Sequence, residues 1–216
     1  MTEQVKKQQP EEITSKDVTK TYLRWHFANE IPHSFERYIS PSLLYAMMPV
    51  LKKLYKDKDD LKAAYKRQLL FFNTQLTWGG GVITGLMSSM EKERARQEYA
   101  GEEITMTDDL MYNTKAGLMG ALAGIGDAID SGTIQYIFIA IAVPWAQEGN
   151  PLGALFPFVC FAIYQLLVGL FFARRGYALG RNATGLIRSS GVQDAINLLS
   201  ILGVFMMGIL AGNYVK

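Results

Sequence analysis

The sequence predicts an all-α, polytopic membrane protein with amphipathic N-terminal helices, a re-entrant hairpin and two to three transmembrane helices. Three observations support this prediction. Charged residues make up only 19% of the 216 residues. More than half of the lysines and arginines lie within residues 1–68, whereas the interval 119–173 contains neither. Residues 152–173 also lack acidic side chains, and an uncharged run of this length is long enough to span a bilayer.

The N-terminal third divides into two predicted parts. Residues 1–20 are polar and are predicted to form a flexible tail. Residues 21–68 mix aromatic and aliphatic side chains with charges, a pattern typical of amphipathic helices at the cytoplasmic face. Helices lying on the membrane surface and ordinary cytoplasmic helices both fit this pattern. The rest of the chain, residues 69–216, is predicted to form the membrane domain.

Residues 69–90 form the first uncharged run, but its centre is polar. Asn73, Thr74 and Gln75 are followed by three consecutive glycines at 79–81, and basic residues flank the run on both sides. Basic flanks place both ends in the cytoplasm. The glycines disfavour a continuous helix exposed to lipid. These features predict a re-entrant hairpin.

The next helix is marked by its start and by an irregular end. A charged helix over 91–100 is predicted to stop near Gly101, and Thr107 followed by two aspartates favours a new helix start. This helix leads into a glycine-rich string at 124–133 that contains Asp127 and Asp130. The glycines predict a break between helices at Asp127.

Two crossings are predicted at about 133–146 and 152–173, and a third is predicted at 196–212. The intervening turn, 149–151, has no basic residue, whereas Arg174 and Arg175 follow the second crossing directly. The bias of basic residues toward the cytoplasm therefore places this turn outside and the N-terminus in the cytoplasm.

Polar groups at membrane depth are the candidate functional residues. A carboxylate there is costly and is usually paired or functional. Carboxylates and carboxamides also suit an uncharged ligand that is rich in hydroxyl groups, such as a sugar. Two structural interpretations compete with this one: Asp130 could simply cap the following helix, and Asp127 could be a structural pair.

Several function classes lack support in the sequence. His26 and His33 are not accompanied by further metal ligands, Cys160 is the single cysteine, and no serine or cysteine lies in a nucleophile motif. The glycine-rich string is not a dinucleotide fingerprint. No motif that reads nucleic acid is present. We therefore expect no metal, no cofactor, no nucleic-acid partner and no catalytic residue.

Five strings together resemble the IID membrane component of the mannose-type sugar phosphotransferase system (PTS). They occur in that family's order and approximate spacing, at residues 35–37, 44–55, 71–75, 115–127 and 200–208. The resemblance and the polar positions together give one candidate substrate-binding set. Its members are Glu36, Arg37, Asn73, Thr74, Gln75, Asp127 and Thr133.

The resemblance implies a location and a set of partners. It implies a bacterial inner-membrane subunit that forms a hexose uptake pathway with a IIC subunit, in a trimer of IIC–IID pairs surrounded by lipid. Cytoplasmic IIA and IIB proteins would phosphorylate the sugar, and IID itself would not be phosphorylated. Two alternatives stay open. One is a structural membrane partner that stabilises IIC without contacting sugar, and the other is a membrane enzyme that uses Asp127 or Asp130.

Overall fold

The computed structural model describes residues 9–180 and four isolated helical positions, 201, 205, 208 and 212. Within these residues the structure is helical, with strand-like pairing only at the bridges Ser34–Tyr38 and Tyr38–Phe72. The predicted all-α class is confirmed. In chain order the helices are α1 (Ser15–Ala28), α2 (Ser40–Leu54), α3 (Lys58–Gln68), α4 (Trp78–Ala100), α5 (Asp108–Gly126), the π-helix η1 (Asp127–Ile134), α6 (Gln135–Gln147) and α7 (Leu152–Leu179).

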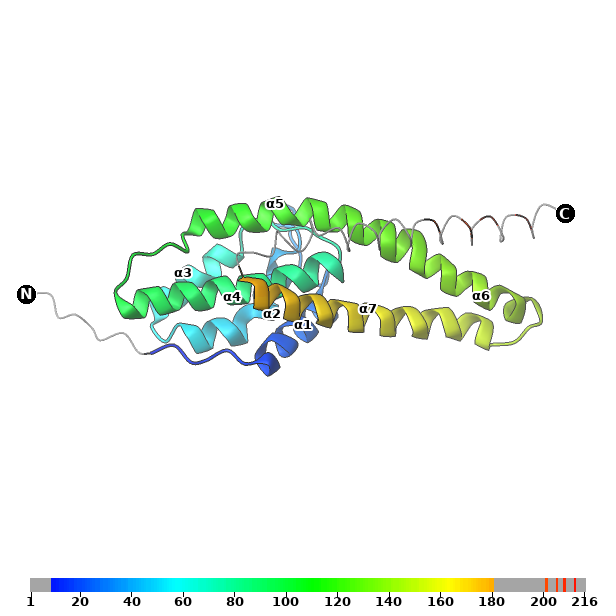
Figure 1. Ribbon diagram of the computed structural model, residues 1–216, viewed down its shortest axis with the longest axis horizontal. Helices are drawn as coiled ribbons and strands as arrows, with labels where there is room; N and C mark the ends of the chain where they lie inside the picture. The colour runs from blue at the N-terminus through cyan, green and yellow to red at the C-terminus, as the bar shows by residue number, and fades with distance from the viewer. Residues whose placement is uncertain (1–8, 181–200, 202–204, 206–207, 209–211, 213–216) are drawn as a thin grey trace, which may run out of the picture.

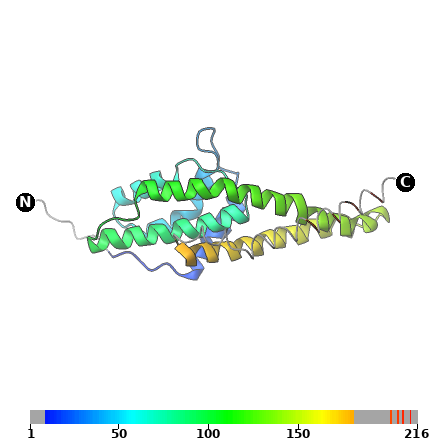
Figure 2. The same ribbon diagram turned by 45° about the horizontal axis from the view of Figure 1, so that its top comes forward.

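The molecule is elongated, with a helical head at one end and a two-helix arm at the other. Helices α1 to α4 and the start of α5 form the head (Figure 1). From there α5, η1 and α6 continue as one long helix to the far end of the arm. Helix α7 returns along α6 and ends against α4. Figure 2 shows the same head and arm from a second direction.

Helix α1 begins earlier than the sequence analysis expected. The Thr14 hydroxyl accepts a hydrogen bond from the backbone N–H of Asp17, whose carboxylate accepts in return from the backbone N–H of Thr14. This capping box satisfies two N–H groups at the helix start. Trp25 and Tyr22 are then fully buried. Residues 15–20 of the predicted flexible tail, 1–20, are therefore helical, and residues 1–8 of it lie outside the described residues.

The amphipathic pattern of residues 21–68 corresponds to three helices that pack around α4. Helix α2 buries one continuous face that includes Leu43, Met47 and Leu51. Helix α3 is capped by the Asp57 carboxylate, which accepts from two backbone N–H groups. Because all three helices bury a face inside the head, their packing needs no membrane surface. Their position relative to the bilayer stays a prediction.

The predicted re-entrant hairpin is wrong in form. Residues 69–77 are irregular, and α4 then runs without a break from Trp78 through all three glycines to Ala100. The glycines lie inside protein, where the indole of Trp25 covers Gly80 and the side chain of Thr74 covers Gly79. Close packing against α1 and the irregular segment thus offsets the low helix propensity of glycine. Helix α4 ends where predicted, at a left-handed Gly101.

Small residues allow α4 and α7 to approach closely. A side chain at Gly85 would overlap the carbonyl oxygen of Ala173, and one at Gly176 would overlap the carbonyl oxygen of Val82. Both overlaps involve backbone atoms, which cannot rotate away. Such small-residue contacts are a common way for helices to associate at short distance in membrane proteins.

Gly85→Ala is therefore expected to destabilise the chain by about 1–3 kcal/mol, the usual range for overpacking. The added methyl group would force α4 away from α7. The measurement is the thermal unfolding midpoint in detergent. Gly117→Ala is the matched control, because nothing lies within 4 Å of a methyl group there. Equal midpoints for the two variants would contradict the close packing.

Two segments are long and apolar enough to cross a membrane: Asp108–Gln147 and Leu152–Leu179. Only 22% and 11% of their most apolar windows are buried, so they are not the core helices of a soluble domain. These segments contain the two predicted crossings. The segment Asp108–Gln147 begins well before the predicted crossing at 133–146. The predicted third crossing, 196–212, falls almost entirely outside the described residues.

The predicted break at Asp127 is also wrong. Helix α5 begins at the predicted Thr107 cap. It then passes into η1 and on into α6 without an interruption of the backbone. The irregularity takes the form of a π-helix, in which the Thr133 hydroxyl donates to the carbonyl oxygen of Ala128, five residues back. π-Helical turns inside α-helices often occur at functional sites.

Candidate functional site

Gln75 holds the start of α4 in place. Its amide oxygen accepts hydrogen bonds from the backbone N–H groups of Thr77 (2.8 Å) and Trp78 (2.7 Å). It therefore acts as the cap that this helix otherwise lacks, because Thr77 makes no side-chain cap bond. The orientation of the amide is fixed by these bonds, so its NH2 group points away from the helix start and toward η1.

The NH2 group of Gln75 donates to Asp130, which is the centre of a buried polar junction. One Asp130 oxygen, Oδ2, accepts from Gln75 Nε2 at 2.6 Å. The other, Oδ1, accepts from the indole of Trp78 at 3.0 Å and from the hydroxyl of Tyr164 at 2.8 Å. We call these four residues, Gln75, Trp78, Asp130 and Tyr164, the polar junction. It joins the irregular segment, α4, η1 and α7.

Asp130 is fully buried, and no ion pair links it to a lysine or arginine among the described residues. Three neutral donors face its carboxylate instead, and the adjacent N-terminus of α4 adds a favourable dipole. Both oxygens are therefore occupied. A carboxylate held in this way is suited to fixing helices and is poorly placed to remove a proton from a ligand.

The irregular segment is also attached to α5. The hydroxyl of Thr74 donates to the carbonyl oxygen of Met119 at 3.1 Å. The ammonium group of Lys115, a buried residue, donates to the carbonyl oxygen of Leu70 at 3.2 Å and lies over the ring of Phe72. The Lys115 bond satisfies a carbonyl group of the irregular segment, and the Thr74 bond attaches that segment to the backbone of α5. The segment 69–77 is thus held on two sides.

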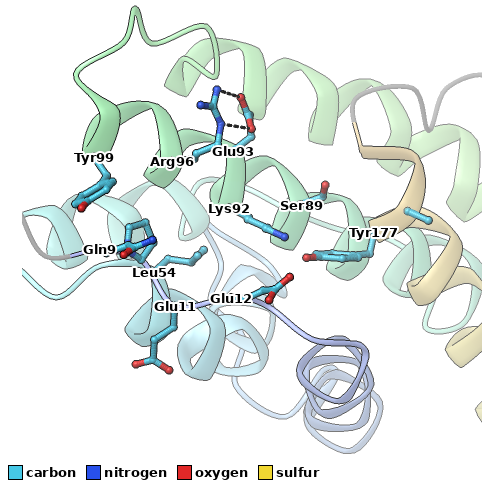
Figure 3. A pocket seen from close by; sticks show the side chains of 12 residues that line it. Gln9, Glu11, Glu12, Leu54, Ser89, Lys92, Glu93, Arg96, Tyr99 and Tyr177 are labelled. Carbon is cyan, nitrogen blue, oxygen red and sulfur yellow. Dashed lines mark hydrogen bonds and ion pairs between the residues drawn. The ribbon is translucent and has the colours of Figure 1, made fainter.

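A separate cavity of about 640 Å³ lies at the opposite end of α4, between the N-terminal segment and the end of α7 (Figure 3). Two of its five charged lining residues pair with each other: Arg96 bonds to Glu93, and it also bonds to Glu102 outside the lining. The Arg96 hydrogen bonds hold the pKa of the Glu93 carboxyl below its ordinary value. None of the predicted site residues lines this cavity.

Comparison with known proteins identifies the family. Residues 12–216 match the family described as the PTS system mannose/fructose/sorbose family IID component. The chain belongs to this family. It is a membrane protein and a transport subunit of the phosphotransferase system, as the resemblance predicted.

Several relatives are similar over most of this IID chain. It is 33% identical to the sorbose-specific EIID component of Lacticaseibacillus casei, covering 92% of this chain and 67% of that one. It is 32% identical to the mannose-specific EIID component of Escherichia coli (strain K12), covering 94% and 69%. The IID chain therefore spans about two thirds of the length of these relatives.

Solved structures agree with the assignment. The IID chain is similar to a chain in the cryo-electron microscopy structure of the mannose transporter ManYZ with microcin E492, with a TM-score of 0.70 and 31% identity. That match covers 95% of this chain and 72% of the other. A second match, described as a membrane protein, has a TM-score of 0.80 and 30% identity and covers 93% and 71%.

The fold brings several predicted site residues of this IID component together. Gln75 reaches the glycine-rich string, where it bonds to Asp130, a residue outside the predicted substrate-binding set. The loop that carries Glu36 and Arg37 lies beside Asn73, because the backbones of Arg37 and Phe72 hydrogen-bond. This loop projects from the head and is visible at the top of Figure 2.

The predicted residues divide by exposure. Glu36, Arg37, Asn73 and Asp127 are exposed, and their side chains make no hydrogen bond or ion pair to another described residue. Thr74, Gln75 and Thr133 instead satisfy groups within the chain. The first group is free to contact a ligand or a partner. The side chains of the second group are engaged in bonds within the chain.

Three residues at this site were missed. Asp130 was interpreted as a helix cap or as the base of a membrane enzyme and was left out of the substrate-binding set, but its side chain bonds to the irregular segment, α4 and α7. Trp78 and Tyr164 were not considered. Tyr164 carried a usable signal, since a tyrosine in the middle of an apolar span needs a partner for its hydroxyl. Lys115 carried the same signal as a cation near a membrane segment.

Proposed function

We propose that this IID chain forms, together with a IIC membrane subunit, the pathway by which a bacterial cell takes up a hexose or hexose derivative. Cytoplasmic IIA and IIB proteins phosphorylate the sugar, and the IID chain itself is not catalytic. The observation that carries the proposal is the similarity, over 95% of the chain, to a chain of the ManYZ mannose transporter structure. The complex we propose is a trimer of IIC–IID pairs in the inner membrane.

The exposed faces of the arm support a membrane partner. Phe158 on α7 is 74% exposed, and Leu155, Leu167 and Ile141 are also among the exposed apolar side chains. An apolar surface of this extent requires lipid or another protein against it. Helices α6 and α7 alone cannot enclose a sugar pathway. A IIC subunit packed on the arm would supply the missing wall.

The distribution of charge supports a cytoplasmic head and N-terminus. The turn between α6 and α7, residues 148–151, contains no basic residue, whereas Arg174 and Arg175 lie near the other end of α7. Basic residues favour the cytoplasmic side of the membrane. This orientation places the many lysines of the head on the side where IIA and IIB act.

A second candidate function is supported by the polar junction. Every oxygen of Asp130 is occupied by donors from the same chain. This arrangement favours a structural role, in which the IID chain stabilises IIC without contacting sugar. The exposed residues Glu36, Arg37, Asn73 and Asp127 distinguish the two functions, because only a sugar pathway requires them for uptake in an assembled complex.

Asp127→Asn is expected to lower sugar uptake by about tenfold or more while the complex still assembles. A charge-assisted hydrogen bond to a sugar hydroxyl contributes about 1.5–3 kcal/mol, and 1.4 kcal/mol corresponds to a factor of ten. The measurements are uptake of labelled mannose, fructose and sorbose by cells that express the permease, and co-purification of IIC from their membranes with mass analysis.

Glu148→Gln is the matched control, because it makes the same chemical change at an exposed position in the turn after α6. It should leave uptake unchanged. Normal uptake in Asp127→Asn would remove Asp127 from the sugar pathway. Parallel loss of uptake and assembly would favour the structural role. Failure of any IIC subunit to co-purify with the unmodified chain would overturn the proposed permease itself.

A further inference from the structure

Helices α1 and α7 lie antiparallel where the head meets the arm. Three hydrogen bonds define this arrangement. The hydroxyl of Tyr177 donates to the carbonyl oxygen of Ile13 (3.1 Å), and Arg174 donates to the hydroxyl of Thr19 (3.3 Å). The hydroxyl of Tyr22 donates to the carbonyl oxygen of Gln165 (3.2 Å). The bonded partners thus run in opposite directions: later residues of α1 bond to earlier residues of α7.

A cavity of about 330 Å³ opens between these helices, beside the end of the membrane-spanning α7. It is lined by Ser15, Lys16, Thr19, Lys20, Leu23 and Arg174. Three of these six residues are cations, two are hydroxyl donors, and none is acidic. Lys16 and Lys20 make no ion pair with any described residue. The cavity is therefore built to receive a negatively charged group.

Each helix also presents an apolar stripe that leads away from the cations. On α1, Lys16 and Lys20 share one face with Leu23 and with Phe27, which is 72% exposed, at helical spacings of three and four residues. On α7, Arg174 shares its face with the exposed residues Ile163 and Leu167, eleven and seven positions earlier.

Because the helices are antiparallel, the basic ends of both stripes meet at the cavity and both apolar ends point toward the arm. The cavity and the two stripes together form one groove.

We propose that this groove binds an anionic phospholipid, with its phosphate between Lys16, Lys20 and Arg174 and an acyl chain along the apolar stripes. The combination of clustered cations and adjoining apolar stripes identifies the ligand as an anionic lipid. A soluble anion would use the cations but would have no need of the apolar stripe, whereas a zwitterionic lipid would leave cationic charge unbalanced.

The binding is measured by native mass spectrometry of the IID chain purified from membranes with its co-purifying partner. After delipidation, phosphatidylglycerol and phosphatidylcholine are added at equal concentration and the bound lipids are counted. The unmodified complex is expected to retain phosphatidylglycerol preferentially. The triple variant Lys16→Gln, Lys20→Gln, Arg174→Gln is expected to lose that preference by about tenfold or more, since each basic residue near anionic lipid contributes about 1 kcal/mol.

The matched control is Lys58→Gln, Lys62→Gln, Lys66→Gln, which removes the same charge from exposed positions on α3. It should keep the preference. An unchanged preference in the Lys16, Lys20, Arg174 variant, or equal losses in both variants, would overturn the proposal. Competition by inorganic phosphate or glycerol phosphate at the concentration of the lipid would overturn it as well, because the site would then bind soluble anions. Circular dichroism of both variants verifies that each one is folded.

Discussion

Replacing Asp130 by alanine is expected to destabilise the protein by about 3 kcal/mol or more, because three donors lose their acceptor at once. Gln75, Trp78 and Tyr164 would each retain a buried or partly buried donor group without a partner, and each such group costs about 1–3 kcal/mol. The thermal midpoint in detergent should fall by roughly 6–12 °C for a chain of this length. Recovery of the IIC–IID complex should fall with it.

Asp130→Asn tests the geometry more finely. An asparagine oxygen can still accept from Trp78 and Tyr164, but its NH2 group would face the NH2 group of Gln75. Gln75 cannot rotate to resolve this conflict, because its oxygen is held by the backbone N–H groups at the start of α4. We expect a loss smaller than that of alanine but still measurable, about 1–2 kcal/mol.

Asp127→Asn serves as the control for both variants, because it lies on the same π-helix and is exposed. Its effect on stability should stay within about 0.5 kcal/mol, as is usual for surface substitutions. Melting of Asp130→Ala at the temperature of the unmodified protein would show that the polar junction contributes nothing to stability. It would also remove the argument for a structural role of Asp130.

The helix boundaries and the arm could be predicted because their signals are local. Thr107 and the aspartates after it mark a helix start, and Gly101 marks a helix end, through groups only a few residues apart. Helix α7 could be predicted because the absence of charge over 152–173 is itself the physical requirement for a lipid-exposed helix. These elements needed no knowledge of distant parts of the chain.

The continuous course of α4 could not be predicted from local signals. Three consecutive glycines are unfavourable in an isolated helix. They become suitable only because Trp25, more than fifty positions earlier, occupies the space beside Gly80. The Trp25 indole also donates to the carbonyl oxygen of Leu76, at the end of the irregular segment. Tertiary packing thus decides between a helix and a break.

The choice between Asp127 and Asp130 depended on the same kind of distant information. Both lie in one glycine-rich string, and their separation of three residues gives no local reason to favour either. The partners of Asp130 are 55, 52 and 34 positions away in sequence. The π-helix also changes the rotation per residue, so α-helical spacing misplaces the faces of this segment. The sequence therefore pointed to this string, but it could not show that Asp130 is the carboxylate that joins the helices.

A second buried group of polar side chains joins the helices of the head. Arg67 donates two parallel hydrogen bonds to the carboxylate of Glu91, at 3.0 and 2.8 Å, and a third to Asp108. The hydroxyl of Tyr55 and the amide of Gln68 also donate to Glu91, both at 2.6 Å. Burial raises the pKa of the Tyr55 hydroxyl above its ordinary value, so this group stays a donor. The Glu91 and Arg67 side chains are 0% and 2% exposed.

Arg67→Met is expected to destabilise the head by about 3–5 kcal/mol, the cost of leaving one member of a buried ion pair without its partner. The methionine fills most of the space of the arginine stem, so packing changes little and the uncompensated charge of Glu91 dominates. The measurement is the thermal midpoint of the purified protein. The exposed pair of Arg96 and Glu102 provides the control, because it has the same 2.8 Å separation in solvent, and Arg96→Met should have little effect.

The double variant Arg67→Met, Glu91→Gln separates charge from hydrogen bonding. It removes both buried charges, and the glutamine oxygen still accepts from Tyr55 or Gln68. We therefore expect the double variant to be more stable than Arg67→Met alone, by about 1–3 kcal/mol, even though it carries one more substitution. If the second substitution instead adds its own loss to the first, the buried charge of Glu91 is not what destabilises Arg67→Met. The lost bond from Arg67 to Asp108 at the start of α5 would then be the cause.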